Sequence, residues 1–224
     1  MTVPWLRRRA ASRFLVSSWW WFGLVLAAVG AGLVANAARA PGAAIALPAG
    51  LVSRLEAGDL VFRIGSGWQS QVARGAGRAG RGDPYSHVGM LVGSPARWEV
   101  LHAVPAEAPG RADAVVRDDL GFFLAPERAR GIAIYRVAAD AATRAAAVDY
   151  ALRRLGTPFR IVENDREGQY CTTLVWRAWL RAGVDLGARF EHLDIPLAAG
   201  DYLLPHSLRA APGLRLLFET PMGR

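Results

Sequence analysis

An apolar stripe with helical spacing begins at the only cysteine of the 224-residue chain. Its members recur at intervals of three and four residues: Cys171, Leu174, Val175, Ala178, Trp179 and Ala182. This spacing predicts a helix that buries one face and ends at Gly183. The thiol heads the buried face, so we expect it in the first helical turn, facing a sheet, where the helix dipole favours thiolate. Because a single cysteine cannot form an internal disulfide, packing or reactivity must account for it.

Two alternating segments ahead of this helix predict a pair of antiparallel strands. Ser86–Val92 and Trp98–Val104 are joined by a short turn. Side chains alternate between the two faces of a strand, so His87 on the first strand and His102 on the second can lie on one face. Gly89, on the same face as His87, leaves room for another element to approach closely.

Further strands and helices complete an α+β pattern after residue 52. The strands are predicted at Leu60–Ile64 and Ile132–Val137. The helices are predicted from the N-cap Asp140 to Leu155, at Asp118–Leu124 and after Ser207, the last two being short. The apolar stripe of the longer helix is Ala141, Ala145, Val148, Leu152 and Leu155. The tail after the cysteine helix is otherwise expected to be irregular.

The N-terminal part has the pattern of a membrane-targeting segment. Phe14–Ala35 is uncharged, and at 1.5 Å per residue it reaches ~33 Å, enough for a hydrocarbon core of ~30 Å. Arginines at positions 7, 8, 9 and 13 predict a cytoplasmic N-terminus. We expect residues 1–13 in the cytoplasm, a single transmembrane anchor over 14–35, a linker over 36–52, and a domain over 53–224 on the extracytoplasmic side. The alternative is a cleaved signal peptide, because Ala35-Asn36-Ala37 has the form of a cleavage site and leads to the same compartment.

Charge and residue spacing exclude several classes of function. The formal net charge is +8, but the first 40 residues hold five arginines and no acid, so the remainder carries only +3. No basic stripe interleaved with aromatic residues follows, so we expect no nucleic-acid partner. Four histidines and one cysteine lack zinc-ligand spacing, so we expect no metal and no other cofactor. His192 and His206 are interpreted as solvated or capping side chains. The absence of a Gly-x-Ser-x-Gly element argues against a serine hydrolase.

A nucleophilic thiol needs a base within hydrogen-bond reach and a third group that orients the base. The predicted layout offers Cys171 at a helix start, His87 on a strand and His102 on the neighbouring strand. The Cys171 backbone N–H is a candidate oxyanion donor. Gln69 is another candidate, although its position also fits a local helix capping box.

Four sequence blocks occur in order within residues 58–210: Gly58-Asp59-Leu60-Val61-Phe62, Tyr85-Ser86-His87-Val88-Gly89-Met90, Leu155-Gly156-Thr157-Pro158-Phe159 and Tyr170-Cys171-Thr172-Thr173-Leu174-Val175. Together they resemble the YiiX-type permuted papain-like enzymes, relatives of the NlpC-type cell-wall peptidases and of the lecithin:retinol acyltransferase group. The resemblance implies a circularly permuted papain-like domain with an antiparallel sheet packed on the cysteine helix. It also implies Cys171 as the nucleophile and His87 as the general base.

The same resemblance puts the third, polar member of the triad on the strand after His87, where a Glu is common. The end of that strand places His102 there, as in the acyltransferase branch; Glu99 points to the opposite face and is the second choice. Two positions depart from the family pattern: Thr173 stands where a Glu is usual, and Arg160 where an Asp often follows. Neither removes a triad member, but both leave the usual substrate contacts unassigned.

The leading hypothesis is a membrane-anchored thiol hydrolase, an amidase or peptidase that works through a Cys-His-His triad and an acyl-enzyme. Its expected substrates are cell-envelope peptides or N-acyl lipid-type molecules. A lipid acyltransferase or thioesterase is the first alternative, and a non-catalytic envelope binding module is the second. The sequence does not indicate the oligomeric state.

Overall fold

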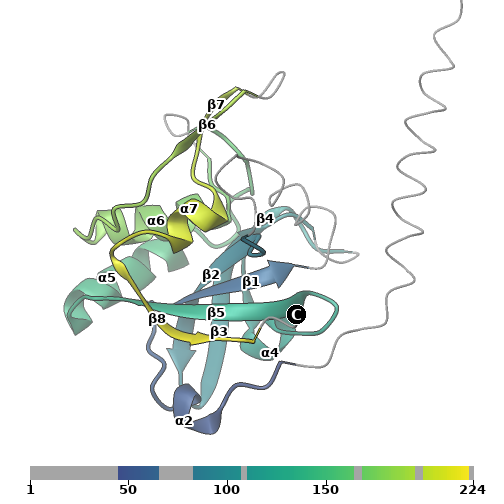
Figure 1. Ribbon diagram of the computed structural model, residues 1–224, viewed down its shortest axis with the longest axis vertical. Helices are drawn as coiled ribbons and strands as arrows, with labels where there is room; N and C mark the ends of the chain where they lie inside the picture. Colours follow the sequence, from purple (N-terminus) through teal and green to yellow (C-terminus); the bar gives the residue numbers. More distant parts are fainter. Residues whose placement is uncertain (1–44, 66–82, 107–109, 164–167, 195–198, 222–224) are drawn as a thin grey trace, which may run out of the picture. The chain divides into compact units, whose positions relative to one another are not determined.

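An antiparallel sheet of six strands organises the described part of the chain (Figure 1), with strand order β4-β3-β2-β1-β5-β8. The computed structural model describes residues 45–65, 83–106, 110–163, 168–194 and 199–221. The strands are β1 (Leu60–Gly65), β2 (His87–Ser94), β3 (Arg97–Val104), β4 (Ala114–Asp119), β5 (Ala129–Val137) and β8 (Leu214–Glu219). A separate short pair is formed by β6 (Glu191–Leu193) and β7 (Gly200–Tyr202). Sheet and helices together confirm the predicted α+β class.

Apolar side chains fill both faces of the sheet, which is why its central strands are almost wholly buried. Phe62 pairs with Val88 on one face, and Leu91 pairs with Val100 on the other. Each fully buried side chain of this size contributes roughly 1.5–3 kcal/mol relative to exposure. The sheet therefore separates two apolar clusters, which hold the helices on its two sides.

The first cluster joins one sheet face to α5 (Ala141–Leu152), α6 (Cys171–Arg181) and α7 (Pro205–Arg209). The second joins the opposite face to α2 (Ala49–Val52) and α4 (Leu120–Phe123). Cys171, Val88 and Met90 belong to the first cluster. Phe123 belongs to the second. This division decides what surrounds each candidate site residue.

Side chains next to the cysteine fix the start of α6. The Thr173 hydroxyl accepts a hydrogen bond from the Tyr170 N–H at 3.0 Å. This gives the backbone N–H of the residue just before the helix a hydrogen-bond partner. The Thr172 hydroxyl donates to the Leu203 carbonyl at 2.6 Å, and the Tyr170 hydroxyl accepts from the Leu203 N–H at 2.8 Å. Gly183 follows the helix at φ 90°, as a helix stop requires. The prediction for this helix is confirmed, and Thr173 has a structural task.

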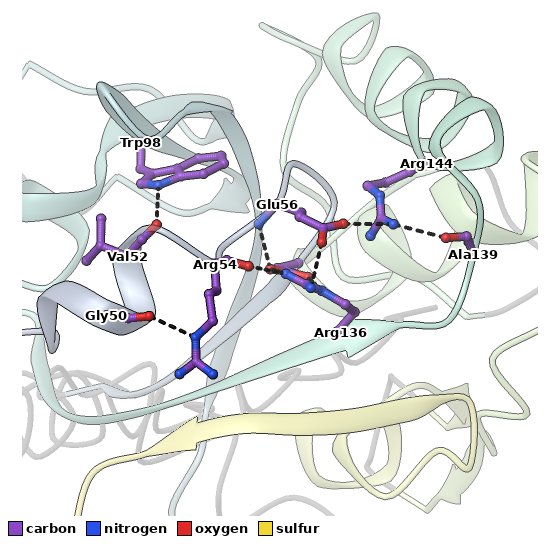
Figure 2. A network of polar contacts seen from close by, with 9 residues as sticks. Gly50, Val52, Arg54, Glu56, Trp98, Arg136, Ala139 and Arg144 are labelled. Carbon is purple, nitrogen blue, oxygen red and sulfur yellow. Dashed lines mark hydrogen bonds and ion pairs between the residues drawn. The ribbon is translucent and has the colours of Figure 1, made fainter.

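A network of ion pairs ties the segment before β1 to β5 and α5 (Figure 2). Arg136 donates to both carboxylate oxygens of Asp59, at 2.8 and 2.7 Å, and to Glu56 at 2.7 Å. Arg144 contacts the other Glu56 oxygen at 2.8 Å and donates to the Ala139 carbonyl at 2.9 Å. Asp59 is fully buried. Its charge is therefore compensated entirely inside the protein.

Several predicted elements differ from the structure. The segment predicted as a helix from Asp118 to Leu124 begins as the end of β4, and only Leu120–Phe123 is helical. Strand pairing overrides the helical pattern there, because β4 completes the hydrogen bonds of β3. In the range 36–52 predicted as a linker, Ala49–Val52 forms a helical turn whose Leu51 is buried.

The helix after Asp140 begins where predicted, since the Asp140 side chain accepts a hydrogen bond from the Thr143 N–H at 2.7 Å. It ends at Leu152 rather than Leu155. Its fully buried side chains are Ala147 and Ala151, whereas Val148 and Leu152 of the predicted stripe are partly buried against the first cluster. The tail is not irregular, because β8 adds to the edge of the sheet beside β5. The short helix near Ser207 starts at Pro205, and Ser207 is not its cap.

The predicted anchor over 14–35 lies outside the described residues, as does Gln69. Within the described ranges, no helix is both long and apolar enough to span a bilayer.

Candidate active site

The thiol of Cys171 lies in the first turn of α6 and packs against the backbone of β2. Its side chain belongs to the first apolar cluster, and the residue is 8% exposed. The backbone N–H groups of Val88, Thr172 and Cys171 itself act on the sulfur and lower the pKa of the thiol. The prediction that the thiol faces the sheet is therefore confirmed, and its contact on β2 is the residue directly after His87.

Burial makes Cys171 a thiol rather than a thiolate at neutral pH. Desolvation raises the pKa of the Cys171 thiol to about 11, and the N–H donors and the positive charge of Arg63 lower it only in part. This corrects the expectation that the helix start favours thiolate. The dipole acts on the sulfur, but removing the sulfur from water outweighs it.

His87 and His102 form a buried pair. His87 Nε2 lies 2.8 Å from His102 Nδ1, and the rings meet edge to face with centroids 5.0 Å apart. Both rings also pack against Phe123, at centroid distances of 5.9 and 5.1 Å. His102 is fully buried and His87 is 7% exposed. The expectation that these histidines of adjacent strands share one face is confirmed.

Gly89 makes the approach of His102 sterically feasible. A methyl group on Gly89 would lie 3.1 Å from His102 Cβ and 2.3 Å from Val100 Cγ1. These distances are shorter than ordinary van der Waals contacts, so only glycine fits this position without displacement. The predicted role of Gly89 in close approach is confirmed, and the approaching element is β3.

A carboxylate that sequence reasoning missed completes the series. His102 Nε2 lies 3.1 Å from Asp118 Oδ2. Arg111 Nη2 donates to both Asp118 oxygens, at 2.7 and 2.9 Å. Burial acts to raise the pKa of Asp118, but the hydrogen bonds from His102 and Arg111 together outweigh it, so that the pKa is lowered. The sequence pattern predicts Asp118 at the start of a helix. Alternation of side chains between the two faces of a strand at Ala114–Asp119, paired with β3, would have placed Asp118 beside His102.

Arg63 places a buried positive charge beside the histidine pair. It pairs with His87 across β1 and β2, and its guanidinium lies 4.4 Å from the centroid of the Phe123 ring. Desolvation is the main cause that lowers the pKa of His87 well below 6.5, and the charges of Arg63 and His102 lower it further. His87 is therefore neutral at pH 7.

Glu99, the second choice for the third member, lies at a different place on β3. It pairs with Val92 across β2, and its carboxylate is 3.4 Å from Arg117 and 3.8 Å from Arg97. The other two histidines also have acidic neighbours: His192 with Asp201 at 2.8 Å, and His206 with Glu191. His192 is exposed as expected, whereas the His206 side chain is only 11% exposed and is not the cap of α7. Within the described part of the chain, none of these residues contacts the histidine pair.

The described residues do not fit a metal site. Within them, no group of three or more His, Cys, Asp or Glu side chains could hold a metal ion. His87, His102 and Asp118 are hydrogen-bonded in series, so they do not converge on one point.

Comparisons with known proteins concern the family and the fold of the chain. The family model described as permuted papain-like amidase enzyme, YaeF/YiiX, C92 family, matches residues 54–198. The chain is also similar to the crystal structure of the metalloprotein yiiX from Escherichia coli O157:H7, with 21% identity and a TM-score of 0.59. That likeness covers 74% of this chain and 97% of the other, and at this identity it shows the fold alone. Comparison with curated proteins gives no significant match.

Proposed function

Because the chain belongs to the permuted papain-like amidase family YaeF/YiiX, we propose that it is a cysteine hydrolase that cleaves amide bonds. Cys171 is the nucleophile, His87 the general base and His102 the group that orients the base. The observation that carries this proposal is the 2.8 Å contact between His87 Nε2 and His102 Nδ1, next to Val88, whose backbone N–H lowers the pKa of the thiol. The contact occupies Nε2 of His87 and leaves Nδ1 for the thiol.

The position of the thiol supports this use of Nδ1. Nδ1 is the ring nitrogen nearer the main chain, and Cys171 shares the first cluster with Val88, the residue next to His87, whose N–H lowers the pKa of the thiol. The His87 ring packs toward Phe123 on the second cluster, whereas the thiol belongs to the first. The proposal therefore requires that His87 Nδ1 reach the sulfur around the start of β2, where the strand backbone separates the two clusters.

The charge states favour attack assisted by the base over a preformed ion pair. With the thiol pKa at about 11 and His87 neutral, the proton moves to His87 Nδ1 while Sγ attacks the carbonyl carbon. The developing oxyanion lies near the N–H groups at the start of α6. His87 then gives the proton to the leaving amine, and the thioester forms. A water deprotonated by His87 attacks the thioester and releases the acid and the free thiol.

Acylation by p-nitrophenyl acetate tests the proposal on the full chain. Native protein should gain one acetyl group on its only cysteine, detected by mass spectrometry, and Cys171→Ala should gain none. His87→Gln should acylate at least ~100-fold more slowly, because a positioned base contributes about 10²–10⁴-fold. His192→Gln is the matched control, since this histidine is exposed and paired with Asp201. Undiminished acetylation of Cys171→Ala, or equal rates in both histidine variants, would contradict the proposal.

Acyl transfer is the second candidate function. It is favoured by His102, because the third member of the triad is commonly a Glu in the amidase pattern. In that case the thioester is attacked by an amine or alcohol instead of water. Product analysis in the presence of a primary amine distinguishes the two. An N-acyl product indicates transfer, and free acid alone indicates hydrolysis.

We also propose that the domain works on envelope peptides or N-acyl lipids outside the cytoplasm. The support is the uncharged run 14–35 preceded by four arginines. A C-terminal alkaline phosphatase fusion should be active in cells if this is correct. An inactive fusion that is stably produced would place the domain in the cytoplasm.

A further inference from the structure

The group that orients His87 is itself held by a buried carboxylate. His102 is fully buried, and Asp118 on the neighbouring strand β4 is 8% exposed. His102 Nε2 and Asp118 Oδ2 lie 3.1 Å apart. His102 therefore has one ring nitrogen toward His87 and the other toward Asp118.

Arg111 keeps Asp118 ionised and fixes its orientation. One guanidinium nitrogen donates to both carboxylate oxygens, at 2.7 and 2.9 Å. An ionised carboxylate can only accept hydrogen bonds. The proton between Asp118 and His102 must therefore reside on His102 Nε2.

The proton on His102 Nε2 also determines which nitrogen of His87 carries a proton. A neutral imidazole with its proton on Nε2 offers Nδ1 as an acceptor. His102 Nδ1 thus accepts from His87, which must carry its own proton on Nε2. The lone pair of His87 is then on Nδ1, the nitrogen that takes the thiol proton in the proposed reaction.

We propose that Asp118, held by Arg111, is a positioning residue that sets the tautomers of both His102 and His87. It acts through the two imidazoles and does not touch the substrate. The kinetic consequence rests on the proposed hydrolase function, whereas the tautomers can be measured without any turnover.

Asp118→Asn isolates the proton assignment, because it keeps the size of the side chain. Its amide can turn an N–H toward His102 Nε2, which favours the other tautomer of both rings. Asp119→Asn is the matched control. Asp119 is the next residue in the chain, its side chain is 57% exposed, and it pairs with Arg97 instead.

Nitrogen-15 NMR of the full chain labelled at histidine reads the tautomers directly. At a pH where the rings are neutral, native protein and Asp119→Asn should show both His87 and His102 protonated at Nε2. Asp118→Asn should shift both rings toward Nδ1 protonation. Native rings protonated at Nδ1, or unchanged tautomers in a folded Asp118→Asn, would overturn the inference. The native spectrum decides the matter even if the variant does not fold.

Acylation by p-nitrophenyl acetate supplies the kinetic arm. Asp118→Asn should acylate roughly 10–100-fold more slowly at neutral pH, since an orienting partner acts through the base. The deficit should shrink as pH rises toward about 11, where the thiol ionises without the base. A merely structural role predicts the same deficit at every pH.

The two arms also separate this inference from the proposed function. Native tautomers as expected without any acylation of Cys171 would leave the positioning role standing and remove the hydrolase. Acylation that is dependent on Cys171 but insensitive to Asp118→Asn would remove the positioning role alone.

Discussion

Burial sets the charge of the two reacting groups at the residue scale. It raises the pKa of the Cys171 thiol to about 11 and lowers the pKa of His87 well below 6.5. Both groups are neutral at pH 7, so Cys171 and His87 do not form a thiolate–imidazolium ion pair before the substrate binds. The imidazolium forms only during the reaction. The carboxylate of Asp118, hydrogen-bonded to His102, then favours positive charge on the imidazoles.

A neutral buried histidine makes the stability of the domain depend on pH. The unfolded His87 binds a proton near pH 6.5, whereas the folded one does so only well below that value. Between these two values the unfolded state binds the extra proton. Lowering the pH below 6.5 should therefore reduce the free energy of unfolding, by up to ~1.4 kcal/mol per pH unit for one proton.

Denaturant titrations of native protein and His87→Gln between pH 7 and pH 5 measure this effect. The variant should show a smaller loss of stability with falling pH. His192→Gln is the control: the hydrogen bond to Asp201 raises the pKa of His192, so its contribution is present below 6.5 and is lost as pH rises. An equal pH slope in His87→Gln and native protein would contradict the prediction.

At the scale of elements, the contact between β2 and β3 controls the placement of His102. The alternation of both strands puts the histidines on one face, but the missing side chain at Gly89 decides how closely the strands can bring them. The local sequence thus determines both the sheet face that the two histidines share and the room that Gly89 leaves for His102.

Gly89→Ala tests whether the missing side chain at Gly89 limits how closely β2 and β3 bring the two histidines together. The added methyl group would overlap Val100 Cγ1 and crowd His102 Cβ, so we expect a loss of about 1–3 kcal/mol from overpacking. Acylation of Cys171 should fall as well, because His102 must move. Chemical denaturation and the p-nitrophenyl acetate assay measure the two effects.

Gly121→Ala in α4 is the matched control for that substitution. Nothing lies within 4 Å of the position of its added methyl group. It should be neutral or slightly stabilising, by up to ~1 kcal/mol, because alanine reduces the freedom of the unfolded chain. Equal stability of the two alanine variants would show that the approach of β3 is not limited by space.

At the scale of the whole molecule, buried charge joins segments that are far apart in the sequence. Asp59 precedes β1 and is held by Arg136 of β5, 77 residues later. The same sheet carries His87 on β2 next to β1. The network therefore anchors the strand beside the candidate base.

Removing the cation of this network should destabilise the domain strongly. Arg136→Met would leave the fully buried Asp59 carboxylate without its cationic partner, at a cost of about 3–5 kcal/mol. Arg117→Met is the control, since this half-exposed arginine pairs with Glu99 near the surface and should cost at most ~1 kcal/mol. Chemical denaturation compares the two, and similar losses would show that burial does not govern the contribution of Arg136.

Long-range pairing explains which elements could be predicted. The helix at Cys171, the cap at Asp140 and the strands around His87 and His102 follow from periodicity within a dozen residues. β4 and β8 were missed because their short segments gain their hydrogen bonds from partners elsewhere in the chain. Helix α5 was found, and Val148 and Leu152 of its predicted stripe pack against the core, but its buried face is shifted toward Ala147 and Ala151, because α6, distant in sequence, packs against it.

The sequence by itself determined that Cys171 heads a buried helical stripe and that His87 and His102 share one face of a strand pair. Both properties depend on local periodicity, which a chain carries before it folds. Only the tertiary structure decided that the thiol is neutral and that Asp118 and Arg111 stand behind His102. Desolvation and ion pairing depend on atoms brought together from distant segments, and no local pattern specifies them.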